Sequence, residues 1–280
     1  IFVRQARSAG APSLIIAAYR LTFAAALLAP YTLMRHRSDL ARLSRRAWRA
    51  ALVSGAFLGL HFAAWIASLD FTTIAASIVL VTTSPLWVAL AAAVFLREPL
   101  TRPVVIGLAL ALAGGLIITA DASGCVEGSL CNEPLLGDAL ALAGAIAIAV
   151  YFLLGRRLRR SLPLAPYVFL VYSTSAVTLL IAAMVAGLSF TGQPAPYSAG
   201  ALGWIALLAI GPQLIGHSSL NYALKYLPTP FVAMATLGEP IGSTILAFVV
   251  LHEQPSLATW IGGALILAGI AAASHASGAP

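Results

Sequence analysis

Charge is what this sequence lacks most. Only 9% of its 280 residues are Asp, Glu, Lys or Arg, whereas 60% are hydrophobic. A soluble globular domain has roughly a quarter of its residues charged, because its surface must face water. With a mean hydropathy of +0.95, the chain has too little polar surface for that, and we expect it to lie in a lipid bilayer.

Long polar segments are missing as well, which excludes an extramembrane enzyme domain. The apolar stretches are close to the roughly 20 residues that cross a membrane as a helix. They are too long and too evenly apolar for the strands of a β-barrel, which alternate over roughly ten residues. The sequence therefore predicts an all-α integral membrane protein with transmembrane helices at residues 11–34, 50–69, 73–96, 103–120, 135–155, 165–190, 199–222, 228–251 and 256–274.

Cysteine is scarce, and motifs for metals and nucleotides are missing. The two cysteines, Cys125 and Cys131, share one loop, where an oxidising compartment would allow a disulfide and a reducing one would leave free thiols. Two ligands without a nearby His are too few for zinc. The glycine clusters at 107–114 and 262–269 lack the Gly-Lys-Ser of a phosphate loop, so we interpret them as helix-packing surfaces. We expect no metal, no cofactor and no ATP-driven transport.

Acidic residues are fewer than basic ones, with nine Asp and Glu against 16 Lys and Arg. Nucleic-acid binding is not expected, because the basic residues gather in alternate loops. Such alternation is what the positive-inside rule requires of consecutive spans, and it places the basic loops in the cytoplasm. Arg4 and Arg7 alone fall on the predicted outer side. The basic loop residues are Arg35, Arg37, Arg42, Arg45, Arg46, Arg49, Arg97, Arg102, Arg156, Arg157, Arg159, Arg160 and Lys225.

The chain contains an internal duplication. Residues 106–114 (IGLALALAG) and 261–269 (IGGALILAG) are identical at seven of nine positions, at an offset of 155 residues. The same offset pairs Pro85 with Pro240. Each copy holds an odd number of spans, so the second copy enters the membrane from the opposite side. Inverted repeats of this kind are typical of secondary transporters.

The duplication also predicts the domain organisation. The helix at 135–155 should have a counterpart in the first repeat, and the offset of 155 residues places that counterpart before residue 1. We therefore expect ten helices in the full protein, in two inverted five-helix repeats. Residues 1–124 form the first repeat without its first helix, residues 125–134 an outer loop, and residues 135–280 the second repeat.

Two loops that each carry a Glu lead into the duplicated, glycine-spaced helices. They read FLREP at residues 95–99 and VLHEQ at residues 250–254. Together with the Tyr19-Arg20 pair inside a helix, these motifs resemble the EamA-type members of the drug/metabolite transporter superfamily. The resemblance covers the whole chain and is strongest to the aromatic amino-acid exporter branch. It implies a carrier in the bacterial inner membrane that exports amino acids or related metabolites.

Two ionisable residues lie at membrane depth, where a charge costs several kcal/mol unless it is paired or faces water. We interpret Glu239 as a site for a substrate ammonium or for a coupling proton. Arg20 would be its counter-charge or an anchor for a substrate carboxylate. The alternatives are a structural ion pair and an Arg20 side chain that reaches toward the lipid headgroups.

Two polar stripes occur at helical spacing. His61 and Trp65 share one helix face, and His217 and Asn221 share the corresponding face in the second repeat. We expect both stripes to line a substrate site, although each is also compatible with packing. Further substrate-binding candidates are Trp87, Tyr151 and Tyr222 as aromatic walls and Ser84 beside the first proline.

Pro85 and Pro240 occupy equivalent positions in the middle of two spans. Proline breaks the helical hydrogen-bond ladder, which is tolerated at membrane depth where the helix lines a cavity or meets another helix. We expect both residues to mark kinks or hinges.

The leading hypothesis is a secondary transporter that exports amino acids, aromatic ones included, or related small metabolites by alternating access, with a proton as a candidate coupling ion. A drug or other metabolite carrier would share the same fold. An intramembrane enzyme is disfavoured, because His61, His217 and Glu239 match no recognised catalytic spacing. The oligomeric state is left open.

Overall fold

The computed structural model describes residues 2–120, 133–192, 196–252 and 254–277. Its secondary structure is helical, and no strand occurs in these ranges, which confirms the all-α prediction. Within them, seven helices are long and apolar enough to cross a membrane, and two shorter apolar helices complete the predicted series. Cys125, Cys131 and most of the expected outer loop lie outside the described residues.

Contacts divide the chain into two compact units, each described by itself. Unit 1 comprises Ile1–Ile66 and Leu154–Tyr226, and unit 2 comprises Ala67–Leu153 and Leu227–Pro280. Helices α4 (Arg45–Phe71) and α8 (Pro134–Arg159) each contribute residues to both units. Each unit therefore combines segments from both expected repeats.

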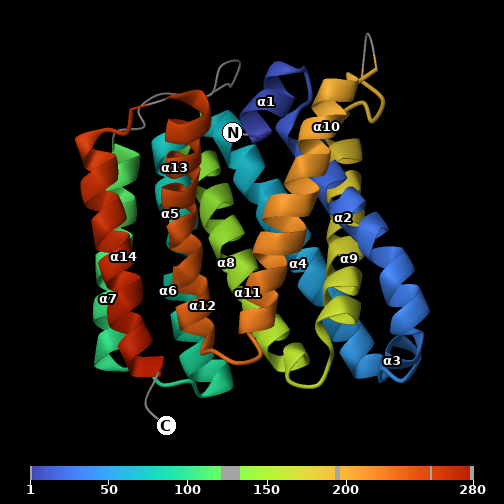
Figure 1. Cartoon of the computed structure of the whole chain (residues 1–280), viewed down its shortest axis with the longest axis horizontal. Coiled ribbons are helices and arrows are strands. Elements are labelled where there is room, and N and C mark those ends of the chain that lie inside the picture. The colour runs from blue at the N-terminus through green and yellow to red at the C-terminus, as the bar shows by residue number, and fades with distance from the viewer. Residues whose placement is uncertain (1, 121–132, 193–195, 253, 278–280) are drawn as a thin grey trace. The chain divides into compact units, whose positions relative to one another are not determined.

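The core of unit 1 is built by two helix pairs, α2 with α9 and α1 with α10 (Figure 1). In the second pair, the ring of Phe2 stacks on that of Trp204 with the centroids 5.9 Å apart. Besides its parts of α4 and α8, unit 1 contains α1 (Phe2–Ser8), α2 (Ser13–Arg35), α3 (Arg37–Ala41), α9 (Leu164–Val185), α10 (Ala199–Leu208), the π-helix η2 (Ala209–His217) and α11 (Ser218–Ala223).

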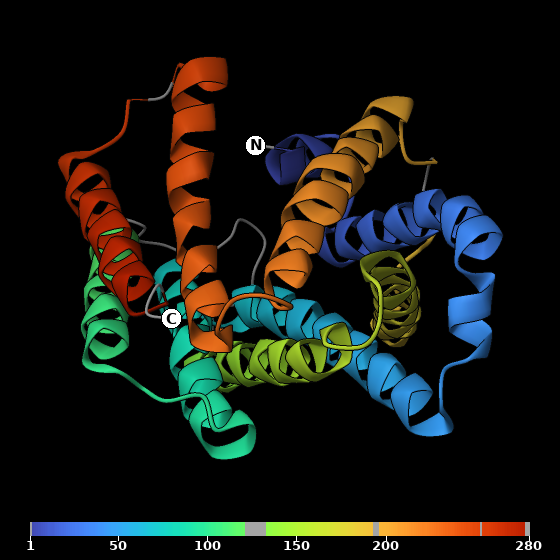
Figure 2. The same cartoon turned by 60° about the horizontal axis from the view of Figure 1, so that its bottom comes forward.

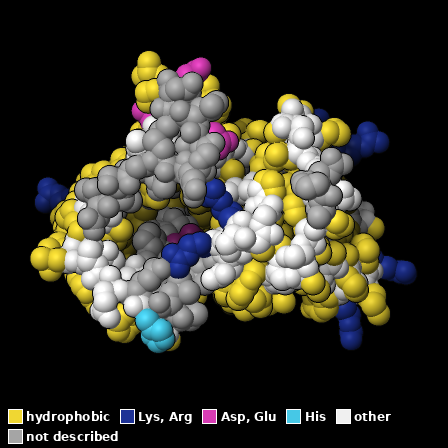
Figure 3. Space-filling model, turned by 90° about the horizontal axis from the view of Figure 1, so that it is seen from above, with side chains coloured by type: hydrophobic (Ala, Val, Ile, Leu, Met, Phe, Trp, Pro, Cys, Tyr) yellow, Lys and Arg dark blue, Asp and Glu magenta, His cyan; other side chains and the backbone are white. Residues whose placement is uncertain are grey.

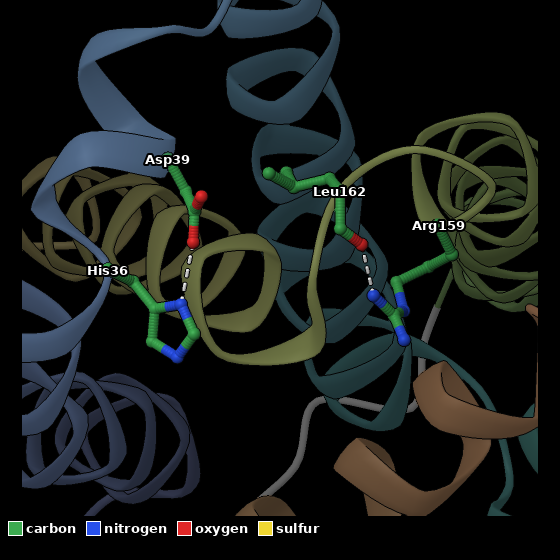
Figure 4. A network of polar contacts seen from close by, with 4 residues as sticks. All are labelled: His36, Asp39, Arg159 and Leu162. Atoms are coloured by element: carbon green, nitrogen blue, oxygen red, sulfur yellow. Dashed lines mark hydrogen bonds and ion pairs between the residues drawn. The ribbon is translucent and has the colours of Figure 1, made fainter.

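Side-chain bonds order two basic loops of unit 1 (Figure 4). The sequence pattern does not predict α3, which forms where Nδ1 of His36 lies 2.7 Å from a carboxylate oxygen of Asp39 in its first turn. Arg159, the last residue of α8, donates to the carbonyl of Leu162 in the following loop and, over 3.0 Å, to that of Asn221. The carbonyl of Asn221 lies in the last turn of α11, where carbonyls have no helical partner, so its bond to Arg159 stabilises the end of that helix.

Unit 2 brings the duplicated helices together. Its helices α7 and α14 lie side by side in Figures 1 and 2. The helices of unit 2 and their bounds are α5 (Ile74–Thr82), α6 (Ser84–Ala91), the π-helix η1 (Ala92–Leu96), α7 (Arg102–Ala120), α12 (Thr229–Ala235), the 3-10 helix η3 (Thr236–Gly238), α13 (Glu239–Leu251) and α14 (Leu257–Ser277).

Glycines allow the backbones of α7 and α14 to touch. A Cβ atom added at Gly107 would lie 2.4 Å from the carbonyl oxygen of Gly269, and one added at Gly114 would lie 2.4 Å from that of Gly262. The lower-numbered glycine of α7 contacts the higher-numbered glycine of α14, and the reverse holds for the other pair, so the two helices are antiparallel. Each glycine contacts the repeat equivalent of the other, which is the exchange that a two-fold axis between inverted copies requires.

Both proline-bearing spans are interrupted at equivalent places. Pro85 is the second residue of α6, after a break from α5, and Pro240 is the second residue of α13, after η3. A proline ring is tolerated in the first turn of a helix, because the amide there needs no helical partner. Each predicted span therefore consists of three helical segments in unit 2, namely α5, α6 and η1 in the first span and α12, η3 and α13 in the second.

Large apolar side chains are exposed on the spanning helices, for example Phe95 (65%) and Trp260 (66%). Hydrophobic side chains also cover much of the described surface on the face shown in Figure 3. Exposed apolar patches of this kind suit a lipid environment rather than water.

Candidate substrate-binding site

Besides Tyr222, five of the residues singled out from the sequence belong to unit 1. They are Arg20 on α2, His61 and Trp65 on α4, His217 on η2 and Asn221 on α11. Arg20 lies seven residues after the start of α2 at Ser13, which is about 10 Å along the helix axis at 1.5 Å per residue.

Phe62, which the sequence did not single out, is the centre around which these side chains gather. The guanidinium carbon of Arg20 lies 4.3 Å from the centroid of its ring. The ring of His217 meets it edge-on at 5.9 Å, and that of His61 at 5.0 Å. His61 in turn stacks on Trp65 at 6.3 Å. We call Arg20, His61, Phe62, Trp65 and His217 the Phe62 cluster.

Glycines on α4 position this cluster. A Cβ atom at Gly55 would lie 2.6 Å from the carbonyl oxygen of Val171, and one at Gly59 would lie 3.1 Å from that of Ser175. The two glycines are four residues apart and share one face, so this stretch of α4 lies directly against α9. Phe62 follows within the next turn, which brings it into the interior of unit 1.

The π-helix η2 presents the second side of the cluster. Pro212 within it has no amide hydrogen and displaces the preceding turn, which favours the wider π turn. The carbonyl of Gln213 then accepts a hydrogen bond from the hydroxyl of Tyr172 on α9, over 3.2 Å. One turn beyond His217, Asn221 is fully buried and its amide donates to the carbonyl of His217 over 2.8 Å.

Apart from the hydroxyl of Thr32, three buried polar side chains of unit 1 contain atoms that have no hydrogen-bond partner among the described residues. These atoms are both amide atoms of Gln213, Nδ1 of His217 and Oγ of Ser175. The sequence analysis missed Gln213 and Ser175. Gln213 was detectable, because it lies four residues before His217 and extends the predicted polar stripe by one turn. Phe62 carried no such signal, since a phenylalanine in an apolar helix is ordinarily a packing residue.

Tyr222 does not join the cluster. Its side chain is 54% exposed, and its ring packs on that of Tyr226 with the centroids 5.0 Å apart. A role of Tyr222 as an aromatic wall stays a prediction.

The remaining candidates belong to unit 2. Ser84 and Pro85 are buried at the start of α6, and the indole of Trp87 donates to the hydroxyl of Thr83 over 3.2 Å. Tyr151 is fully buried on α8. Glu239 is the first residue of α13 and is exposed in this unit. A pairing of Arg20 with Glu239 stays a prediction, because the two residues belong to different units.

The comparisons with known proteins decide the family. A sequence profile described as the EamA-like transporter family matches residues 1–120 and 135–274. The chain belongs to this family. It is therefore a multi-pass membrane transporter of the drug/metabolite transporter superfamily.

Relatives of this EamA transporter carry transporter names. A protein of Archaeoglobus fulgidus named as an uncharacterized transporter is 24% identical over 256 residues, which are 91% of this chain and 85% of that protein. The uncharacterized transporter YyaM of Bacillus subtilis is 25% identical over 195 residues, 68% of this chain and 61% of its own length. A crystal structure of a protein 26% identical to this chain matches with a TM-score of 0.77 and covers 97% of this chain and 91% of that one.

Proposed function

We propose that this EamA transporter exports amino acids, aromatic ones in particular, or closely related small metabolites by alternating access. The observation that supports this proposal is the guanidinium of Arg20, held 4.3 Å from the ring of Phe62 at membrane depth. A guanidinium binds a carboxylate through two parallel hydrogen bonds, and the neighbouring rings offer a surface for an apolar or aromatic side chain.

A drug carrier of the same fold is the second candidate. The aromatic rings of the Phe62 cluster suit an amphiphile, but a cationic drug would meet the like charge of Arg20 in a poorly screened environment. An anionic or zwitterionic substrate therefore matches the cluster better than a cationic one.

We propose that Glu239 either binds the ammonium end of the substrate or couples transport to proton movement. Its carboxylate would bind the ammonium group of an amino acid or carry a proton in exchange for substrate. The experiment is the Glu239→Gln variant, which keeps the shape and removes the charge. Loss of substrate-driven proton movement with binding preserved would assign the coupling role, and loss of binding would assign the ammonium role.

The orientation belongs to the same proposal. We infer that the protein resides in the bacterial inner membrane with its Arg-rich loops in the cytoplasm, as the alternation of charged loops favours. Export is then movement from the side of these loops to the opposite side.

Counterflow in liposomes tests the function without assumptions about coupling. The protein is reconstituted with an excess of unlabelled tyrosine, phenylalanine, tryptophan or leucine inside, and uptake of the labelled amino acid is followed. We expect saturable uptake that Arg20→Gln lowers by about tenfold or more, because a charged hydrogen bond is lost. Arg35→Gln, the same change at the exposed end of α2, is the matched control and should transport normally.

Either of two results would count against the proposal. Absence of counterflow for every amino acid, with counterflow of a drug or another metabolite, would replace the substrate class. Equal activity of the Arg20→Gln and Arg35→Gln variants would remove Arg20 from the binding site.

A further inference from the structure

The side chain of Gln213 is the most unusual buried group in unit 1. It is 0% exposed, yet neither its amide nitrogen nor its amide oxygen has a hydrogen-bond partner among the described residues. Burying an amide without partners costs free energy, so such groups are rare in proteins unless a ligand or water completes them.

The surroundings of Gln213 connect it with the Phe62 cluster. The hydroxyl of Tyr172 donates to the backbone carbonyl of Gln213. Arg20 and His217 both contact the ring of Phe62. His217 follows Gln213 by four residues and so lies on the same face of η2, where its Nδ1 also has no partner in the described chain.

Ser175 adds a hydroxyl on the facing helix. It follows Tyr172 by three residues on α9 and therefore shares the face that meets η2. Its Oγ is buried and has no partner within the described ranges. Gln213, Ser175 and His217 thus offer neutral donors and acceptors beside a cluster of rings.

The chemistry of these groups selects a kind of ligand. A substrate carboxylate is served by the positive charge of Arg20, whereas a neutral amide pairs best with a neutral group that both donates and accepts. A phenolic hydroxyl has both capacities, and an indole N–H has the first. Phenylalanine has neither and would leave the amide unpaired.

We infer that Gln213 is a specificity-determining residue that hydrogen-bonds the polar group on the ring of an aromatic substrate. The inference rests on the proposed amino-acid export and adds which aromatic substrates are preferred. A site built to hydrogen-bond a substrate hydroxyl rejects the analogue that lacks it, because the buried amide then stays unpaired. The transporter therefore prefers tyrosine and tryptophan to phenylalanine.

The test compares tyrosine with phenylalanine in counterflow, for the unmodified protein and for the Gln213→Leu variant. We expect the unmodified protein to favour tyrosine by about tenfold or more at equal low concentration. Leu has nearly the size of Gln and no hydrogen-bonding atoms, so the variant should lose this preference while it still transports phenylalanine. Ser175→Ala should also reduce the preference for tyrosine over phenylalanine. Gln254→Leu, which makes the same change as Gln213→Leu at an exposed residue, should leave this preference unchanged.

Thermal unfolding separates this role from a structural one. Replacing an unpaired buried amide by an apolar side chain removes an unfavourable burial, so Gln213→Leu should raise the melting temperature. A residue that holds the fold through hydrogen bonds would lower it. A lowered melting temperature, or an equal loss of tyrosine and phenylalanine flux, would overturn the inference while leaving the amino-acid proposal intact. Absence of flux for both amino acids in the unmodified protein would instead refute the proposed function, and the inference with it.

Discussion

At the scale of single residues, Arg97 and His252 show how the duplication constrains the backbone. They are the non-glycine residues with a left-handed backbone in the described chain, with φ of +57° and +55°. They are 155 residues apart, the offset of the repeat, and each precedes the Glu of its loop. Both helices therefore end in the same left-handed turn, which glycine ordinarily provides.

This geometry predicts that Arg97→Gly stabilises the protein. A side chain in the left-handed region costs about 1 kcal/mol relative to glycine, and the entropy that glycine adds to the unfolded state offsets part of this gain. We expect a net increase of about 0.5 kcal/mol in the free energy of unfolding, measured as a higher melting temperature in detergent. Arg97→Ala is the control, because it removes the same charge and retains the Cβ atom. An equal shift in both variants would show that the charge rather than the backbone is responsible.

Glu98 has a helix-end role, since one of its carboxylate oxygens accepts a hydrogen bond of 2.7 Å from the backbone amide of Thr229, the first residue of α12. A carboxylate at this position satisfies an amide that has no helical partner. We expect Glu98→Ala to lower the free energy of unfolding by about 1 kcal/mol. Glu98→Gln retains an acceptor and should lose less. Thermal unfolding of both variants shows which one loses more stability. A larger loss in Glu98→Gln than in Glu98→Ala would contradict the capping role.

At the scale of helices, the contact between α7 and α14 depends on glycine. The duplicated pattern predicts a packing surface on both helices, but not that they pack on each other. Their periodicity is uninformative, because both helices are apolar on nearly every face. Antiparallel contact arises because backbones without side chains can approach closely and gain dispersion energy.

Neighbouring glycines on α7 give a matched test of this contact. A Cβ atom at Gly114 would lie 2.4 Å from the carbonyl oxygen of Gly262, whereas one at Gly115 would have nothing within 4 Å. We expect Gly114→Val to lower stability by about 2 kcal/mol or more through overpacking, and Gly115→Val to change it by less than about 0.5 kcal/mol. The folded fraction after heating, followed by size-exclusion chromatography, measures both. Similar losses of stability in the two variants would mean that the effect comes from the helix propensity of valine rather than from the contact with α14.

The breaks within helices were predictable only in part. Pro85 and Pro240 indicate interruptions, and both spans are interrupted beside them. The π-helical course of η2 has a local cause in Pro212, yet that proline does not by itself dictate which carbonyl is left for Tyr172 to bind. That choice depends on α9 lying against η2.

At the scale of the whole molecule, the alternation of basic loops predicts the topology. In a background with Cys125→Ser and Cys131→Ser, Thr191→Cys places one reactive thiol in the loop after α9, and Arg157→Cys places one in the exposed last turn of α8. We expect a membrane-impermeant maleimide to label the Thr191→Cys variant in intact cells. The Arg157→Cys variant should react only after permeabilisation, because this end of α8 is expected in the cytoplasm. The opposite pattern would invert the assigned orientation.

The sequence by itself determined the membrane environment, the all-helical class, the span positions and the duplication. These follow from hydropathy, helix length and repeated residues, which are local or strictly periodic properties. It also singled out candidate substrate-binding residues, because polar residues are conspicuous in an apolar helix. They are Arg20, His61, Trp65, His217 and Asn221.

Only the tertiary structure decided which of these residues meet. Phe62 lies at the centre of the cluster because glycines on α4 allow that helix to touch α9. Tyr222 lies outside the cluster because its side chain is exposed and packs on Tyr226. Gln213 became a candidate once its amide proved to be buried without a partner. Such facts depend on the packing of helices that are distant in sequence, and no local pattern specifies how those helices rotate against one another.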